Sequence, residues 1–187
     1  ERVADAGIDF AMIRAGYRGY TMGTLNIDRY FQANVEGALA AGLDVGFYFF
    51  SQAVTVAEAI EEAQYLMELV EPYRGRIRYP LVFDWERQSA STSRTKDTSE
   101  EMVAACAVAF CETVKANGYI PSKAYSMDLG YLSGYPFWLA HYTKDQAPSS
   151  YRYTFDMWQY SSTWSVPGID GNVDVNICLN PSWFGWW

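Results

Sequence analysis

Short apolar runs alternate with longer amphipathic segments along the first two thirds of the chain. The apolar runs are rich in Val, Ile, Phe and Tyr and are bounded by turn-forming residues, which is typical of buried strands. The loops between the last runs are too short to hold full helices. The pattern predicts seven strands, at Phe10–Arg14, Asp44–Phe50, Tyr79–Glu86, Ile120–Tyr125, Phe137–Tyr142, Phe155–Tyr160 and Val173–Cys178.

Amphipathic segments between the first runs predict helices. Asp28–Ala41 is followed by a glycine that can stop a helix. A second helix is expected to begin at the capping box Thr55–Glu58 and to run to Val70, ahead of a proline that prevents its continuation. A third is expected to begin at the capping box Thr98–Glu101 and to end at Gly118.

Strand followed by helix, repeated three times, favours a parallel sheet that is buried on both faces. We therefore expect an α/β fold, an irregular (β/α)8-type barrel with few helices. Seven strands are one short of the eight that close such a barrel. The opening Glu1–Gly7 resembles the last turns of a helix, so we expect the first strand upstream of it, and an unpaired sheet edge at Phe10–Arg14 or Val173–Cys178. One domain is expected over residues 1–180, followed by a Trp-rich tail at residues 181–187.

Composition excludes several classes of partner. The chain has 187 residues, 50% hydrophobic and 19% charged, with a net charge of −8. Its 14 basic residues are scattered and form no positive stripe for nucleic acid. No run approaches the roughly 20 apolar residues of a membrane span. We therefore expect neither nucleic acid nor a membrane as partner, and a monomer.

The cysteines and aromatic residues leave alternatives open. Cys106, Cys111 and Cys178 match no metal-binding spacing, so we expect no metal or other cofactor, and buried free thiols, with an unassigned pairing as the alternative. Aromatic residues make up 17% of the chain. Such rings can stack on sugars while their N–H and O–H groups bind hydroxyls, but composition alone favours a role in the core.

The candidate chemistry lies at the end of one predicted strand. Asp84 and Glu86 are two residues apart and therefore project to the same face, where a barrel strand ends and active sites are built. Mutual repulsion and burial would raise one of the two pKa values, as a carboxyl group that donates a proton near neutral pH requires. Glycoside hydrolysis uses such a pair, whereas the alternative is an ordinary solvated strand end. Asp174 and Asn176 also share a strand face, a pattern that by itself favours a structural role.

The chain resembles the family 25 lysozymes over nearly its whole length. The joint order and spacing of several motifs carry the resemblance, although each is weak alone. They are Ile8-Asp9-Phe10 with Ile13-Arg14-Ala15-Gly16-Tyr17, Gly46-Phe47-Tyr48-Phe49-Phe50-Ser51, Phe83-Asp84-Trp85-Glu86, Trp138-Leu139-Ala140-His141-Tyr142, Met157-Trp158-Gln159-Tyr160-Ser161-Ser162 and Val173-Asp174-Val175-Asn176.

The resemblance implies a flattened β/α barrel that cleaves the β-1,4 bond between N-acetylmuramic acid and N-acetylglucosamine in peptidoglycan. It implies that Glu86 is the proton donor and that Asp84 and Asp174 are the other active-site carboxylates. It also implies a secreted or cell-wall-associated protein of bacterial or phage origin. The residues expected to bind substrate are Tyr48, Tyr125, Trp158, Gln159, Arg14 and His141.

Two departures from the family pattern stand out. The family opens with a short strand that supplies a further carboxylate, and no such strand precedes Glu1 here. Trp164 stands where a glycine is usual, which could narrow or extend the groove.

Three alternatives remain. A chitinase-like glycosidase would need a further Asp at the position of Val82. A Ser-His-Asp relay would need His141 beside a nucleophile that no motif provides. A catalytically silent glycan-binding module would not need Asp84 and Glu86 intact. For the hydrolase, the 2-acetamido group of the substrate could act as nucleophile with Asp84 orienting it, or water could attack directly with inversion.

Overall fold

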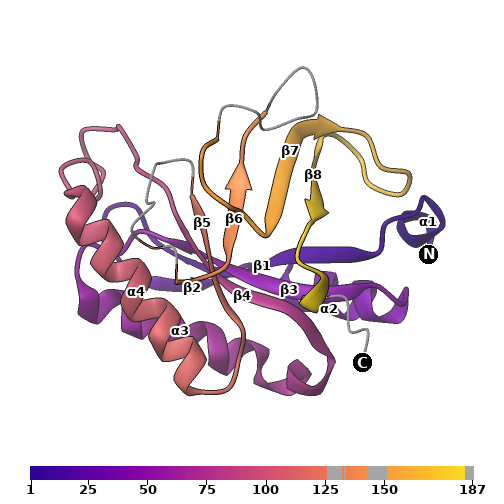
Figure 1. Ribbon diagram of the computed structural model, residues 1–187, viewed down its shortest axis with the longest axis horizontal. Helices are drawn as coiled ribbons and strands as arrows, with labels where there is room; N and C mark the ends of the chain where they lie inside the picture. The colour runs from indigo at the N-terminus through magenta and orange to yellow at the C-terminus, as the bar shows by residue number, and fades with distance from the viewer. Residues whose placement is uncertain (126–131, 133, 143–150, 184–187) are drawn as a thin grey trace.

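A curled, mixed sheet of eight strands organises the chain (Figure 1). The computed structural model describes residues 1–125, 132, 134–142 and 151–183. The strand order is β2-β1-β3-β4-β5-β6-β7-β8. The strands are β1 (Phe10–Arg18), β2 (Leu25–Ile27), β3 (Asp44–Ser51), β4 (Ile77–Trp85), β5 (Pro121–Tyr125), β6 (Phe137–Ala140), β7 (Met157–Trp164) and β8 (Val173–Cys178).

The predicted α/β class is confirmed, with a correction to the strand count. Each of the seven predicted runs forms a strand, and β2 is the eighth. Strands β1 and β3 to β7 pair in parallel, whereas β2 and β8 pair antiparallel to their neighbours. Sequence reasoning missed β2 because three residues are too few to show an alternating pattern.

The sheet is open among the described residues. Strands β2 and β8 are its edges, and β2 pairs with β1 only along Gly16–Arg18. Among the described residues, the first part of β1 pairs with β3 on one side and with no strand on the other, and β8 pairs only with β7. An unpaired edge was expected at Phe10–Arg14 or at Val173–Cys178. The described strands do not close a barrel, and the additional strand expected upstream stays a prediction.

Four α-helices are described, and their caps refine the prediction. They are α1 (Arg2–Asp5), α2 (Phe31–Ala40), α3 (Val56–Val70) and α4 (Glu100–Ala116), with 3-10 turns η1 (Glu71–Arg76) and η3 (Pro181–Trp183). At α3, the Thr55 hydroxyl accepts from the Glu58 N–H, and the Glu58 carboxylate accepts from the Val54 N–H. At α4, the cap is Ser99 rather than Thr98, because a turn at Thr98 precedes the helix. None of the described helices is long and apolar enough to cross a membrane.

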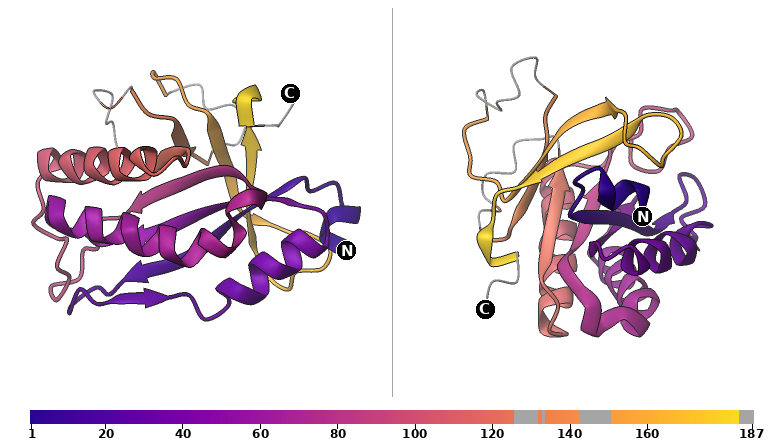
Figure 2. Two further views of the ribbon diagram at one scale, coloured as in Figure 1. Left: turned by 90° about the horizontal axis from the view of Figure 1, so that it is seen from below. Right: turned by 90° about the vertical axis from the view of Figure 1, so that its right-hand side faces the viewer.

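Helices and strands divide the sheet into a covered face and a concave face. Helices α2, α3 and α4 lie along one side of β1, β3, β4 and β5, while β6, β7 and β8 run steeply across and curl over the other side (Figures 1 and 2). On the helix side, Phe47, Phe49 and Phe83 are 0–2% exposed. Burying one such side chain contributes roughly 1.5–3 kcal/mol. Because strand residues alternate, Tyr48 and Asp84 face the concave side.

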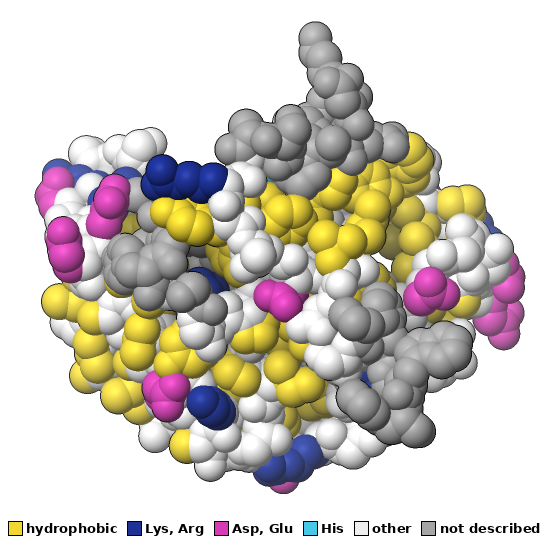
Figure 3. All heavy atoms as spheres, in the orientation of Figure 1, with side chains coloured by type: hydrophobic (Ala, Val, Ile, Leu, Met, Phe, Trp, Pro, Cys, Tyr) yellow, Lys and Arg dark blue, Asp and Glu magenta, His cyan; other side chains and the backbone are white. Residues whose placement is uncertain are grey.

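Three further features of the fold concern the cysteines, the segment at Trp183 and the charged surface. The three cysteines are free and buried, as expected. Trp183 is 3% exposed and packs against Tyr79, so the folded chain continues at least to that residue. In the space-filling view, Lys and Arg side chains form small separate groups among hydrophobic and polar atoms (Figure 3).

Candidate active site

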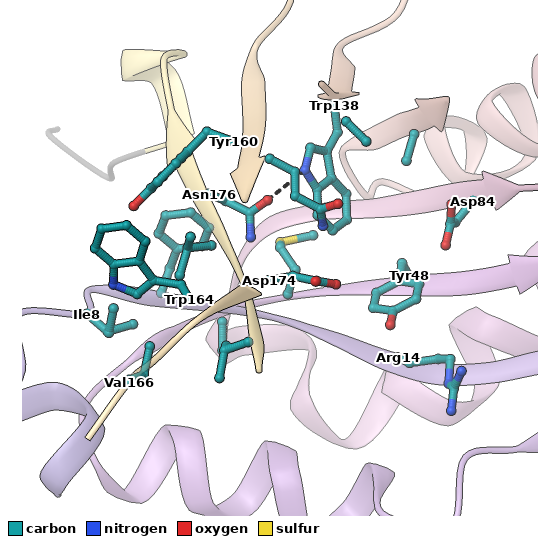
Figure 4. A pocket seen from close by; sticks show the side chains of 18 of the residues that line it. Ile8, Arg14, Tyr48, Asp84, Trp138, Tyr160, Trp164, Val166, Asp174 and Asn176 are labelled. Atoms are coloured by element: carbon teal, nitrogen blue, oxygen red, sulfur yellow. Dashed lines mark hydrogen bonds between the residues drawn. The ribbon is translucent and has the colours of Figure 1, made fainter. Parts of the chain in front are cut away.

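A cavity of about 810 Å³ lies on the concave face of the sheet. Its walls come from strands β1 and β3 to β8 and from the segment after α1. The lining is mixed: carboxylates, arginines and amides share it with Trp, Tyr and aliphatic side chains (Figure 4). A cavity of this size and mixed polarity is typical of a small-molecule or glycan site.

Four carboxylates line this cavity: Asp9, before β1, and the three that the sequence predicted for the site. Asp84 is the penultimate residue of β4, Glu86 follows the strand, and Asp174 lies on β8. Asp84 is half-buried, whereas Glu86 and Asp174 are exposed. The sequence predicted the shared face of Asp84 and Glu86. The curl of the sheet brings β8 and its carboxylate to the same cavity.

Asp84 is the carboxyl group whose pKa the site perturbs most. Burial raises the pKa of Asp84 to about 8, and the neighbouring charges of Glu86 and Asp174 act in the same direction. The Arg14 guanidinium opposes them. Asp84 therefore carries a proton at neutral pH in the free protein. A raised pKa for one member of the pair was expected, and the structure assigns it to Asp84.

Arg14 and Tyr48 also line the cavity, near Asp84. Arg14 donates from Nε to Asp28 Oδ2 over 2.7 Å, and its Nη2 lies 2.7 Å from the same oxygen. In Figure 4, Tyr48 lies between Arg14 and Asp84. The Tyr48 ring packs edge-on against Trp138, and burial raises the pKa of Tyr48 to about 12. The Tyr48 hydroxyl therefore keeps its proton and remains a hydrogen-bond donor.

Two side-chain amides in the lining have defined orientations. Gln159 and Asn176 are directly paired across β7 and β8 and both line the cavity. The Trp138 indole donates to Asn176 Oδ1 over 2.9 Å, as Figure 4 shows. The Tyr142 hydroxyl donates to Gln159 Oε1 over 2.6 Å. Since an indole N–H can only donate, the NH₂ group of Asn176 is the half of the amide left to bind another partner.

Two of the sequence-predicted residues, Trp158 and His141, do not line this cavity. Trp158 is 4% exposed, packs in the main core and donates to the His141 carbonyl over 2.8 Å. Trp158 is not among the residues that line the cavity, whereas its neighbour Gln159 is, so the expectation that Trp158 binds substrate there is corrected. The His141 ring is also outside the lining, and its buried Nδ1 has no hydrogen-bond partner among the described residues. The side chain of Tyr125 lies outside the described residues.

Other lining residues were not singled out as site residues from the sequence. Trp138, Tyr142, Tyr160 and Asn176 belong to them, and the available signal was that each lies within one of the motifs shared with the family. Trp164, the departure from the family pattern, also lines the cavity and packs edge-on against Tyr160. Within the described residues, no cluster of three or more His, Cys, Asp or Glu side chains could hold a metal ion.

Comparisons with known proteins point in one direction. The family model described as glycosyl hydrolases family 25 matches residues 1–169. The uncharacterized protein YegX of Escherichia coli strain K12 is 30% identical over 185 residues, which cover 94% of this chain and 62% of YegX. Lysozyme M1 of Streptomyces globisporus is 28% identical over 188 residues, which cover 93% of this chain and 61% of that protein. The chain thus spans less than two thirds of the length of these relatives.

A solved structure shares the fold. The modular autolysin LytC from Streptococcus pneumoniae, in complex with a synthetic peptidoglycan ligand, aligns with a TM-score of 0.76 and 22% identity. The alignment covers 94% of this chain and 42% of LytC.

Proposed function

Because the chain belongs to the glycosyl hydrolases of family 25, we propose that it is a lysozyme-type muramidase. Its substrate is peptidoglycan, and the bond it hydrolyses is the β-1,4 bond between N-acetylmuramic acid and N-acetylglucosamine. The observation that carries the proposal is the convergence of Asp84, Glu86 and Asp174 on one cavity. The names of Lysozyme M1 and of the LytC complex with a peptidoglycan ligand support the choice of substrate.

The reaction begins with the proton that Asp84 carries. Burial raises the pKa of Asp84 to about 8, so this carboxyl group is protonated at neutral pH in the free protein. A glycosidic oxygen that accepts a hydrogen bond from Glu86 favours transfer of this proton to Glu86, which leaves Asp84 as a carboxylate.

Bond cleavage then uses both carboxyl groups. Glu86 donates its proton to the leaving glycosidic oxygen as the bond to the anomeric carbon breaks. The carbonyl oxygen of the substrate's 2-acetamido group attacks that carbon, while Asp84 accepts a hydrogen bond from the acetamido N–H. Asp174 stabilises the positive charge that develops at the centre. Water then attacks the anomeric carbon, gives its proton to Glu86 and releases the sugar.

The remaining lining groups bind the glycan strand. The oriented NH₂ groups of Gln159 and Asn176 donate to substrate oxygens, and Arg14 carries a positive charge beside the carboxylates. Trp164 is 47% exposed and offers its ring for stacking on a sugar face. The protein acts as a monomer, without a cofactor, outside the cell, where peptidoglycan lies.

Digestion of purified peptidoglycan tests this function. The protein should release fragments whose new reducing ends are muramic acid. Glu86→Gln should abolish at least 99% of the release while the fold persists, because general acid catalysis contributes typically about 10²–10⁴-fold. Glucosamine ends would replace this proposal with a glucosaminidase, and an unchanged rate in Glu86→Gln would exclude Glu86 as the acid.

The mechanism has a separate test. Glycans whose muramic acid carries a free amine lack the internal nucleophile and should be cleaved poorly. Efficient cleavage of such glycans would instead favour direct attack by water, for which the two carboxyl groups would need to lie roughly 6.5–9.5 Å apart.

A further inference from the structure

Glu86 occupies a position where the sheet no longer holds the backbone. The last residue of β4 in register with β3 is Trp85, opposite Ser51, and the register with β5 ends at Asp84. Glu86 is therefore the first residue beyond the ladder, and its side chain is exposed. A general acid needs a fixed position, so some other contact must hold this segment.

The side chain of Gln52 extends the ladder by one residue. Gln52 follows Ser51, is fully buried, and donates from Nε2 to the carbonyl oxygen of Glu86 over 2.8 Å. The same Nε2 donates to the Ser51 carbonyl over 2.9 Å. The amide thus takes the place that a backbone N–H of β3 would have had if the strands had continued to pair.

Thr95 connects Gln52 to Gln88, two residues after Glu86. The Thr95 side chain is fully buried, and its hydroxyl donates to Gln52 Oε1 over 3.2 Å. It accepts from the Gln88 N–H over 3.1 Å. The Ser93 hydroxyl lies 3.1 Å away and is able to donate to it. Since the Thr95 hydroxyl has one proton and two lone pairs, this network uses all of its bonding capacity.

The residues on either side of Glu86 are also held. The Trp85 indole donates to the Ala53 carbonyl over 2.8 Å. Arg87 Nη1 donates to the carbonyl oxygens of Thr95 and Lys96 over 3.2 and 3.0 Å. Each residue from Trp85 to Gln88 is therefore held by at least one hydrogen bond through its backbone or side chain. These bonds fix the backbone from which the Glu86 side chain extends into the cavity.

We propose that Gln52 and Thr95 are positioning residues that hold the general acid Glu86 at the glycosidic oxygen. The proposal rests on the muramidase function above. Neither residue touches substrate: both act through the backbone of residues 86 and 88. Displacement of a catalytic group by about 1 Å can cost about 10²-fold in rate, so loss of this network should lower kcat more than it raises KM.

Thr95→Val is the central variant, because it replaces the hydroxyl with a methyl of similar size. Steady-state kinetics on peptidoglycan fragments should show kcat lowered about 10- to 100-fold with KM within about threefold of wild type. Thr95→Ser keeps the hydroxyl and should restore most of the rate. Thr113→Val is the matched control, since the Thr113 hydroxyl bonds only within α4, to the Ala109 carbonyl, and it should be silent. A Thr95→Val rate within threefold of wild type, or an equal loss in Thr113→Val, would overturn the proposal.

A double-variant cycle separates positioning from general destabilisation. If the network acts through Glu86, adding Thr95→Val to Glu86→Gln should cause no further loss of the residual rate, because the misplaced group can no longer donate a proton. Additive losses in the two variants would contradict an action through Glu86.

Hydrogen exchange of the wild-type protein tests the network without any assay of activity. The Gln88 amide lies outside regular secondary structure but should be protected, because it donates to a buried hydroxyl. Free exchange of this amide would overturn the network. A wild-type protein that releases no muramic acid ends would refute the function instead, while a protected Gln88 amide would still show the network to be present.

Discussion

At the residue scale, burial of the Asp84 carboxyl raises its pKa to about 8, whereas an unfolded chain leaves an aspartate near about 3.9. The folded state therefore binds this proton more tightly than the unfolded state does. The contribution of Asp84 to stability is unchanged below about pH 4 and falls as the pH rises toward about 8. A carboxyl group that we propose takes part in the chemistry thus opposes folding at neutral pH.

Asp84→Asn should therefore stabilise the protein while lowering its activity. The amide is neutral at every pH, so the gain should be small at pH 4 and should grow as the pH rises toward about 8. For a chain of this size, each 1 kcal/mol gained corresponds to a rise in Tm of about 2–4 °C. Calorimetry of both proteins across this pH range measures it. An equal difference at pH 4 and pH 8 would mean that Asp84 does not titrate with a raised pKa.

Asn176→Asp isolates the donor half of an oriented amide. The carboxylate can still accept from the Trp138 indole, but it has lost the NH₂ group that faces the cavity. We expect KM for glycan to rise about tenfold, since a hydrogen bond to substrate typically contributes about 0.5–1.5 kcal/mol and the added negative charge lies near Asp174. Asn34→Asp on α2 adds the same charge outside the cavity and serves as control. Equal KM values for both variants would exclude Asn176 from substrate binding.

At the element scale, the cap of α4 distinguishes the sequence-based boundary from the observed one. The motif Thr98–Glu101 suggested Thr98, whereas Ser99 accepts from the Met102 N–H over 3.2 Å. Ser99→Ala should lower the free energy of unfolding by about 1 kcal/mol, and Thr98→Ala by less. Urea unfolding of both variants measures the difference. A larger loss for Thr98→Ala would place the cap one residue earlier.

The same scale shows how far the sequence predicts this fold. The apolar runs predicted every strand except β2, and the period of two along β4 predicted the shared face of Asp84 and Glu86. The apolar runs could not predict which face of a strand packs against the core and which face lines the cavity. Trp158 and Gln159 are neighbours in one motif, and only the packing of β7 against the core decides that Gln159, not Trp158, faces the cavity.

At the scale of the whole molecule, the helices stabilise the two halves of the sheet unequally. Helices α3 and α4 pack on each other and on β3, β4 and β5, where the core residues are most buried. Within the part of the chain that the structure describes, strand β8 is an edge strand that pairs with β7 alone, and the register between the two shifts twice. The cavity lies between these two regions, so its walls differ in how readily they open.

Hydrogen exchange with mass spectrometry should resolve this difference in the free protein. Amides of β3, β4, α3 and α4 should exchange slowest, at a rate set by global unfolding, and those of β8 fastest among the strands. Peptidoglycan fragments added to the inactive Glu86→Gln variant should slow exchange in β7, β8 and the end of β4, because bound glycan bridges the two walls of the cavity. Helix α2 should not respond, since it does not line the cavity. Uniform protection across the sheet in the free protein, or a response centred on α2, would contradict a glycan site between a rigid wall and a more easily opened one.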